Sequence, residues 1–322
     1  MVHTFDTLKP AKKPTFYFIG VTTGQSAIMD VFPKWADYLG LDAEFVGIDM
    51  QIHDRPENYV AVARFLKNDE KSLGALVTTH KIDMYHACKK AGVFDYFDDY
   101  AAMLEEISCI SKLQGRYEGH AKDPITAGLA FEALVPPDYF AEGDKQILIL
   151  GAGGSSVALC FYLMQRIAET GQAPEKIIVS NRSRKRLDNL ARMLKPHQQV
   201  ALETHCVGED PEKNDRIMKS LSAGAVIINA TGKGKDSPGS PVTDQAPWPD
   251  SALVWEFNYR GELDFLRQAR ANQAERRLTI EDGWIYFIHG WTRVIAEVFH
   301  MDIPTRGPVF DDLCRIAQSI RK

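Results

Sequence analysis

Lys145-Gln-Ile-Leu-Ile-Leu150 runs directly into Gly151-Ala-Gly-Gly-Ser-Ser156, and a further apolar stretch follows. This order predicts a buried parallel strand, a glycine turn and a helix, which together form the first corner of a dinucleotide-binding domain. Gly151 permits the tight turn, and Gly153 lets the backbone approach a pyrophosphate. The free N–H groups of the helix that starts near Ser155 would donate hydrogen bonds to that charged pyrophosphate.

A second predicted strand supports this interpretation, because a glycine pattern alone is weak evidence. Lys176-Ile-Ile-Val-Ser180 is an apolar run that ends in Asn181-Arg-Ser-Arg-Lys-Arg186. The tip of that strand is where such a domain contacts the adenosine ribose; an acidic residue there favours NAD, and a basic cluster favours the 2′-phosphate of NADP. The alternative is that these arginines form a solvated helix start. We predict NADP as the cofactor, bound by Gly151, Gly153, Gly154, Ser155, Asn181, Arg182, Ser183, Arg186, Ala230 and Thr231.

The composition of the 322-residue chain is ordinary for a globular enzyme, with 45% hydrophobic and 25% charged residues. A net charge of −5 argues against a general binder of nucleic acid or membrane surfaces, which would carry a basic field. No stretch reaches the roughly 18 apolar residues of a membrane span, so we expect a cytoplasmic protein. The five cysteines form no CxxC pair and the nine histidines no HExxH motif, so no metal site is expected.

The first part of the chain alternates predicted strands with predicted helices, which implies a mostly parallel sheet covered on both faces. Strands are expected at 15–19, 43–48 and 74–78, and helices at 27–39, 58–68 and 80–91. Two short apolar runs flank Gln114-Gly115, which predicts a hairpin between residues 107 and 119.

Prolines and the end of the strand pattern suggest the domain boundaries. Val135-Pro-Pro137 cannot continue a helix, so the first domain should end near residue 140 and the nucleotide domain should span 141–282. Two helical patterns beyond residue 283 have no strands of their own. We expect these C-terminal helices to pack back on the first domain, which would then comprise 1–140 with 283–322.

Four landmarks in this order resemble the shikimate dehydrogenase family: Val77-Thr-Thr-His-Lys81, Gly119-His-Ala-Lys-Asp123, Gly151-Ala-Gly-Gly154 with Asn181-Arg-Ser183, and Ile228-Asn-Ala-Thr231. The family commonly reads N-V-T-x-P-H-K, G-x-N-T-D, G-A-G-G with N-R-T, and N-A-T at these places. The resemblance spans roughly residues 17 to 303. It implies an α/β fold with an N-terminal α/β substrate domain, a Rossmann NADP-binding domain, and C-terminal helices that return to the first domain.

The resemblance also implies the catalytic pair, because Lys81 matches the family's catalytic lysine and Asp123 the aspartate beside it. Hydride transfer between a secondary alcohol and nicotinamide needs a group that takes or returns the hydroxyl proton, and a partner for the charge on oxygen. A lysine in a cleft can do both, and a carboxylate beside it orients it. The alternative is a surface lysine at a helix start that pairs weakly with an aspartate.

The chain departs from the family mainly at substrate contacts. Where the family has S-x-S-P, only Ser26 of the serines remains, and Ala75 and Ala121 replace two asparagines. Thr79 replaces the proline before the His-Lys pair, and Tyr259 matches a tyrosine at the cleft. We therefore predict Ser26, Thr79 and Tyr259 as substrate contacts. A lost hydrogen-bond partner discriminates against a ligand hydroxyl, so a relative of shikimate is expected as the substrate.

The sequence as a whole predicts an NADP-dependent oxidoreductase that interconverts a hydroxyl and a ketone on a shikimate-like cyclic hydroxy acid. Two alternatives stay open: a catalytically retired NADP-binding sensor or regulator, and a different two-domain dehydrogenase of the folate type. The expected partner is a small molecule, with no nucleic acid and no membrane, and the protein is expected to be a monomer or a homodimer.

Overall fold

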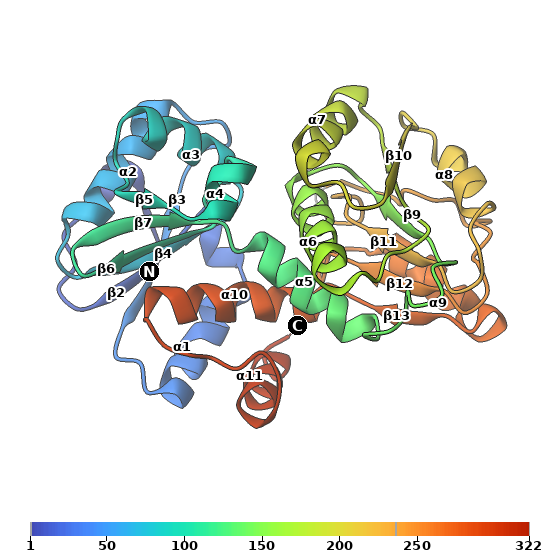
Figure 1. The fold of residues 1–322 in the computed structure, drawn as a ribbon. Coiled ribbons are helices and arrows are strands. Elements are labelled where there is room, and N and C mark those ends of the chain that lie inside the picture. Colours follow the sequence, from blue (N-terminus) through green and yellow to red (C-terminus); the bar gives the residue numbers. More distant parts are fainter. Residues whose placement is uncertain (1, 236, 322) are drawn as a thin grey trace. The chain divides into compact units, whose positions relative to one another are not determined.

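The structure is a computed structural model that describes residues 2–235 and 237–321. The chain forms two compact units, Met1–Lys122 with Ile288–Lys322, and Asp123–Phe287. Each unit contains one β-sheet with helices packed on it (Figure 1). The predicted α/β class is therefore confirmed.

The first unit contains a seven-stranded sheet in the order β1-β3-β2-β4-β6-β7-β5. Its first four strands in that order are parallel, and β6 runs antiparallel to both β4 and β7. The strands are β1 (Val2–Thr4), β2 (Thr15–Gly20), β3 (Glu44–Asp49), β4 (Ser72–Val77), β5 (Tyr96–Phe97), β6 (Cys109–Leu113) and β7 (Arg116–His120). The predicted hairpin joins β6 to β7 through Gln114 and Gly115, whose φ angles of 49° and 82° match the turn that such a dipeptide favours.

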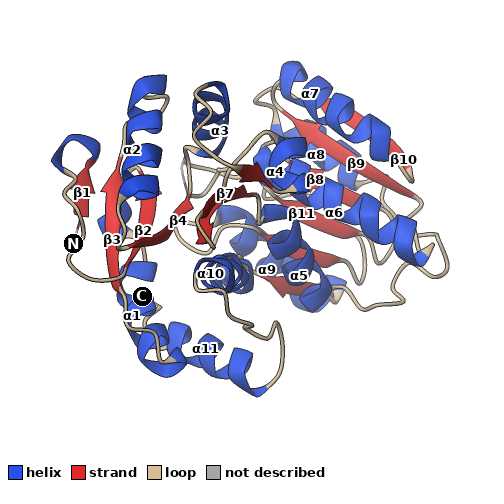
Figure 2. Cartoon of the chain, turned by 60° about the vertical axis from the view of Figure 1, so that its left-hand side comes forward, coloured by secondary structure: helices blue, strands red, loops and turns tan. Residues whose placement is uncertain are grey.

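Helices cover both faces of this sheet (Figure 2) because the side chains of its central strands alternate between the faces. The first-unit helices before the second unit are α1 (Ile28–Leu39), α2 (Pro56–Asn68), α3 (Lys81–Lys90) and α4 (Asp99–Leu104). On one face, Tyr17 and Ile19 join a buried cluster with apolar residues of α2 and α3. On the other, the Phe16 ring lies 5.4 Å from that of Phe32 on α1.

The C-terminal helices are α10 (Trp284–Val298) and α11 (Pro308–Gln318), and the part of the chain from Ile288 on belongs to the first unit. Trp291 of α10 packs edge-on against Phe18, with ring centroids 5.0 Å apart. The Trp35 indole N–H donates to the carbonyl of Leu313 at 2.9 Å, which ties α11 to α1. These contacts confirm that the C-terminal helices return to the first sheet.

The second unit contains a six-stranded, fully parallel sheet in the order β10-β9-β8-β11-β12-β13. Counted from its own first strand, this order is 3-2-1-4-5-6, which is that of a dinucleotide-binding Rossmann sheet. The strands are β8 (Ile147–Leu150), β9 (Lys176–Asn181), β10 (Ala201–Cys206), β11 (Val226–Asn229), β12 (Leu253–Glu256) and β13 (Thr279–Glu281). The helices are α5 (Asp123–Leu134), α6 (Gly154–Thr170), α7 (Arg184–Leu194), α8 (Pro211–Met218) and α9 (Asp264–Arg276).

The boundary between the two compact units lies before α5, whereas the sequence predicts a domain boundary after it, near residue 140. Gly128 of α5 lies against the ring of Tyr162 on α6, and the Tyr162 hydroxyl donates to Glu132 at 2.5 Å. These contacts place α5 with the second compact unit. The division into a substrate domain of residues 1–140 with 283–322 and a nucleotide domain of residues 141–282 stays a prediction.

Among the residues that the structure describes, no helix is both long enough and apolar enough to cross a bilayer. Within the same residues, no cluster of histidine, cysteine and acidic side chains has the makings of a metal site.

Candidate functional site

The glycine turn of the second unit brings two parallel strands close together at their carboxyl ends. Gly151 has a φ of 108°, which side chains disfavour, and a Cβ at this position would lie 2.8 Å from the carbonyl oxygen of Ala230. The Gly151 N–H donates to the carbonyl of Ser180 at 2.7 Å. Only glycine fits this position, because β8 ends directly beside β9 and the segment after β11.

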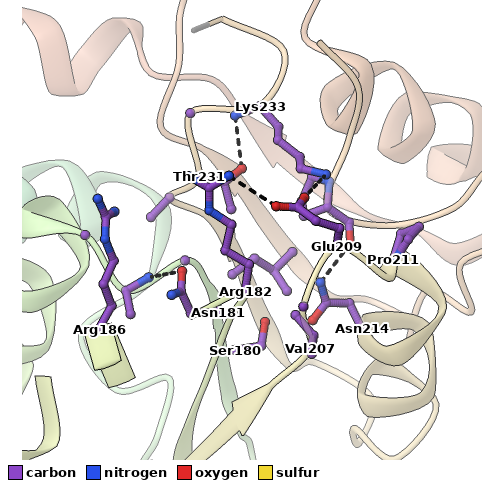
Figure 3. Close-up of a pocket in the computed structure, with 18 of the residues that line it drawn as sticks. Ser180, Asn181, Arg182, Arg186, Val207, Glu209, Pro211, Asn214, Thr231 and Lys233 are labelled. Carbon is purple, nitrogen blue, oxygen red and sulfur yellow. Dashed lines mark hydrogen bonds and ion pairs between the residues drawn. The ribbon is translucent and has the colours of Figure 1, made fainter. Parts of the chain in front are cut away.

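A pocket of about 470 Å³ opens at this edge of the sheet (Figure 3). Seven of the predicted cofactor residues line it: Gly151, Gly153, Asn181, Arg182, Arg186, Ala230 and Thr231. It lies at the carboxyl ends of the strands and next to the place where the strand order reverses, where open α/β sheets bind their ligands. The structure therefore brings most of the predicted cofactor site together in one cavity.

The other three predicted cofactor residues stand next to the pocket. Gly154 is the first residue of α6, Ser155 lies in the first turn of that helix, and Ser183 is the residue before α7. The first N–H groups of a helix have no partner within the helix, so the start of α6 offers donors to an anion. Contact of these three residues with a cofactor stays a prediction.

Asn181 ties the glycine turn to the segment that follows β9. Its side-chain oxygen accepts from the Ala152 N–H at 3.3 Å, and its Nδ2 donates to the Ser183 carbonyl at 3.1 Å. The amide thus holds two segments of the pocket wall in a fixed relation.

Three of the charged side chains of the pocket come from segments that follow three different strands. Arg182 follows β9, Glu209 lies between β10 and α8, and Lys233 follows β11. The Arg182 guanidinium donates to Glu209 at 3.2 Å, and the Lys233 ammonium lies 3.7 Å from the same carboxylate. Arg186 approaches from α7, with its Nη1 3.9 Å from the position that a Cβ of Gly153 would occupy. An anion in this pocket would meet positive charge beside the glycine turn.

A buried network of hydrogen bonds holds Thr231 in place. The Thr231 N–H and hydroxyl both donate to the Asn229 side-chain oxygen, at 3.1 and 2.6 Å. The Asn229 Nδ2 donates to Glu256 at 2.5 Å, and Asn258 donates to the same carboxylate through its backbone and side-chain N–H groups. Glu256 is fully buried, and this burial raises the pKa of its carboxyl to about 7, against the effect of the hydrogen bonds.

The predicted residues of the first unit lie at the carboxyl ends of its parallel strands. Ser26 follows β2 through a short 3-10 turn, and its N–H donates to the Thr23 carbonyl at 3.0 Å. Thr79 and Lys81 follow β4, and the Lys81 N–H donates to the Thr78 carbonyl at the start of α3. Because β2 and β4 are neighbouring parallel strands, these residues share one edge of the sheet.

Asp123 and Tyr259 belong to the second unit. Asp123 is the first residue of α5, and the Tyr259 ring packs on those of Phe287 and Trp284, with centroids 4.7 and 5.3 Å apart. Lys81 and Asp123 lie in different compact units, so the pairing of their side chains stays a prediction.

Three further side chains, those of His80, His289 and Trp291, have contacts within the first unit. His80 is buried, its Nδ1 lies 3.2 Å from the Tyr59 hydroxyl, and its burial lowers its pKa. His289 stacks on Phe310 at 4.5 Å, and its burial lowers its pKa to about 4. Trp291 lies against Phe18, as described above. All three side chains are buried.

The sequence did not single out Glu209 or Lys233, although both line the pocket. Neither belongs to a motif, and each reaches the pocket only because β10 and β11 lie on either side of the β8–β9 pair in the sheet. The glycine-rich segment after Thr231 was the one local signal for Lys233.

Comparison with known proteins finds similar sequences among curated shikimate dehydrogenases. No protein-family model matches the chain. The shikimate dehydrogenase (NADP(+)) of Lactococcus lactis subsp. cremoris (strain MG1363) is 28% identical over 217 residues, which are 64% of this chain and 72% of that protein.

Two solved structures have the same fold over nearly the whole chain. A shikimate dehydrogenase in complex with NADP+ superimposes with a TM-score of 0.71 at 19% identity, covering 97% of this chain and 96% of the other. Quinate dehydrogenase from Corynebacterium glutamicum in complex with NAD gives 0.70 at 17% identity, covering 95% and 99%. The sequence match and the shared fold show that the chain is similar to shikimate dehydrogenases and has their two-domain α/β fold.

Proposed function

We propose that the protein is an NADP-dependent dehydrogenase that interconverts a hydroxyl and a ketone on a shikimate-like cyclic hydroxy acid. The observation that carries the proposal is the pocket at the glycine turn, whose wall combines Gly151 and Gly153 with Asn181, Arg182 and Arg186. The Lactococcus relative is a shikimate dehydrogenase (NADP(+)), and one structural neighbour is in complex with NADP+.

The pocket residues fit NADP in both shape and charge. The missing side chain at Gly153 leaves the backbone open to a pyrophosphate, and the N–H groups near Gly154 and Ser155 would bind its charge. Arg182 and Arg186 would hold the 2′-phosphate, since a guanidinium binds phosphate through two parallel hydrogen bonds. Ala230 and Thr231 would contact the cofactor toward its nicotinamide end. When bound, NADP would exchange a hydride with the substrate carbon.

Lys81 would transfer the hydroxyl proton, with Asp123 as its orienting partner. In the oxidation direction, the Lys81 amine would take the proton as the oxygen gains negative character, and the resulting ammonium would stabilise that charge. Asp123 would hold the ammonium in place during this step.

The substrate would be recognised through Ser26, Thr79 and Tyr259. Ala75 and Ala121 bring no hydrogen-bonding side chain to positions where the family has asparagines. The missing partners disfavour shikimate itself and favour a ring acid with fewer or differently placed hydroxyls. One structural neighbour is a quinate dehydrogenase, so a protein of the same fold serves a related ring acid.

A panel of cyclic hydroxy acids and their ketones, assayed with NADP and NAD at the absorbance of the reduced nicotinamide, tests this proposal. We expect NADP-dependent turnover of at least one ring acid other than shikimate. Binding of NADP without turnover of any member would favour the retired sensor, and turnover of folate derivatives the other alternative. A shikimate kcat/KM above about 10⁵ M⁻¹s⁻¹ would contradict our interpretation of Ala75 and Ala121.

The proposal includes a cytoplasmic monomer or homodimer with a small molecule as partner and no nucleic acid or membrane. Light scattering on the purified protein measures the oligomeric state.

A further inference from the structure

Glu209 lies between two cations in the wall of the pocket (Figure 3). Its Oε1 accepts from Arg182 Nη1 at 3.2 Å, and its Oε2 lies 3.7 Å from Lys233 Nζ. The three side chains come from the segments that follow β9, β10 and β11. One carboxylate therefore connects three strand ends around the space where the proposed cofactor would place its adenosine.

The Arg182 guanidinium has two possible anionic partners in the proposed function. It is held by Glu209 in this structure, and the 2′-phosphate of NADP would need the same guanidinium. A phosphate monoester carries a charge of about −1.5 to −2 at neutral pH, so a carboxylate on the same cation would repel it. The bound phosphate would therefore weaken the Arg182–Glu209 contact, and that contact would weaken the binding of the phosphate.

We propose that Glu209 is a specificity-determining residue that competes with the 2′-phosphate for Arg182 and so lowers the preference for NADP over NAD. This inference rests on the proposed function. NAD carries a neutral hydroxyl at the same place, so its binding leaves the Arg182–Glu209 contact intact.

Arg186 and Lys233 make the exchange of partners possible. Arg186 lies beside Gly153 and, in the view of Figure 3, on the opposite side of Arg182 from Glu209. Arg182 can thus turn from Glu209 toward Arg186, and a phosphate between the two arginines would gain both cations. Glu209 keeps Lys233 as a partner after Arg182 leaves, so the carboxylate retains a neighbouring positive charge.

Solvent limits how strongly Glu209 can change the affinity for NADP+. The side chains of Arg182 and Glu209 are 66% and 65% exposed, so water and salt screen their interaction. An exposed ion pair typically changes an equilibrium constant by at most about fivefold. We therefore expect Glu209→Gln to tighten NADP+ binding by about two- to fivefold and to leave the NAD+ dissociation constant unchanged.

Isothermal titration calorimetry of the full-length protein with NADP+ and NAD+ tests this inference. Glu212→Gln is the matched control, because it removes the same charge three residues away, where Glu212 pairs with Arg216 on α8 and does not belong to the pocket wall. An equal gain in the control would overturn the inference, because it would reflect the overall charge of the protein. An unchanged NADP+ affinity in Glu209→Gln would overturn it as well.

Whether Glu209 affects NADP+ binding through Arg182 is tested by making Glu209→Gln in the Arg182→Ala variant. There the effect of Glu209→Gln should disappear, since the contested guanidinium is gone. A gain that persists in full would show that Glu209 acts on the phosphate without Arg182 and would overturn the competition. If the wild-type protein binds neither NADP+ nor NAD+, the proposed cofactor is wrong. If it binds NADP+ but Glu209→Gln does not change the affinity, only the role of Glu209 is wrong.

Discussion

Asn229 and Glu256 face each other at the carboxyl ends of β11 and β12, and the Asn229 Nδ2 donates to the buried carboxylate at 2.5 Å. This contact fixes which way the Asn229 amide points. Its oxygen is thereby turned toward the N–H and hydroxyl of Thr231, in the wall of the cofactor pocket. A fully buried acid thus controls the orientation of a pocket residue that it does not itself touch.

Exchanging the acid and the amide tests this relationship. Glu256→Gln should destabilise the protein by about 1–3 kcal/mol, because an NH₂ group then faces donors of Asn229 or Asn258. Asn229→Asp should destabilise it further, since two carboxylates would face each other in a buried site. The variant with both changes should recover much of the loss, because the new amide at position 256 would donate to the new carboxylate at position 229, which would still accept from Thr231. Urea unfolding measures all three, and additive losses would contradict the network.

Glu256 also predicts a pH dependence of stability. Its folded-state pKa of about 7 lies above the ordinary value of 4.5, so the folded protein binds the proton more tightly than the unfolded chain. The stability from this group is fully present below pH 4.5 and is lost as the pH rises through 7. At about 1.4 kcal/mol per pKa unit, the wild-type free energy of unfolding should fall by about 3 kcal/mol relative to Glu256→Gln. Urea titrations from pH 5 to 8 cover most of this change, and parallel profiles would contradict it.

The first prediction about the cofactor concerns Arg182, which should give the protein its preference for NADP over NAD. Wild-type protein should bind NADP at least about tenfold more tightly than NAD, because one charge-assisted contact contributes roughly 1.5–3 kcal/mol. Arg182→Ala should remove most of this preference and leave NAD binding nearly unchanged. Arg216→Ala, which removes an arginine of α8 outside the pocket wall, is the control. Equal dissociation constants for the two cofactors in the wild-type protein would refute the assignment.

The proposed role of Lys81 in proton transfer predicts that its substitution slows turnover. Lys81→Ala should lower kcat by roughly 10²–10⁴-fold, the usual contribution of a positioned acid–base group, and leave NADP affinity unchanged. Asp123→Asn should have a smaller effect, and the double variant should be little worse than Lys81→Ala, because the two would act as one unit. Lys90→Ala at the exposed end of α3 is the control. Near-normal turnover in Lys81→Ala would move the proton transfer to another residue, with His80 and Tyr259 the next candidates.

The parts of the fold that could be predicted are those with strong local patterns. The strand before Gly151 is a buried apolar run, and Asn181 and Arg182 follow a second such run, so their places in the sheet were predictable. The strand β10 was not predicted, because it lies at the edge of its sheet and its residues are largely exposed, which leaves Ala201–Cys206 without an apolar pattern. Glu209 follows that strand, so its place in the pocket depends on a sheet order that no local pattern encodes.

Gly128 of α5 lies so close to the Tyr162 ring of α6 that a Cβ there would overlap its atoms. The two positions therefore constrain each other in any sequence that keeps this helix pair: a larger residue at 128 requires a smaller one at 162. A small residue at 162 would also remove the hydroxyl that donates to Glu132, which would keep its contact with Arg166. We expect positions 128 and 162 to change together among close homologues, or not at all, and α5 with its first residue Asp123 to keep its place on α6 for that reason.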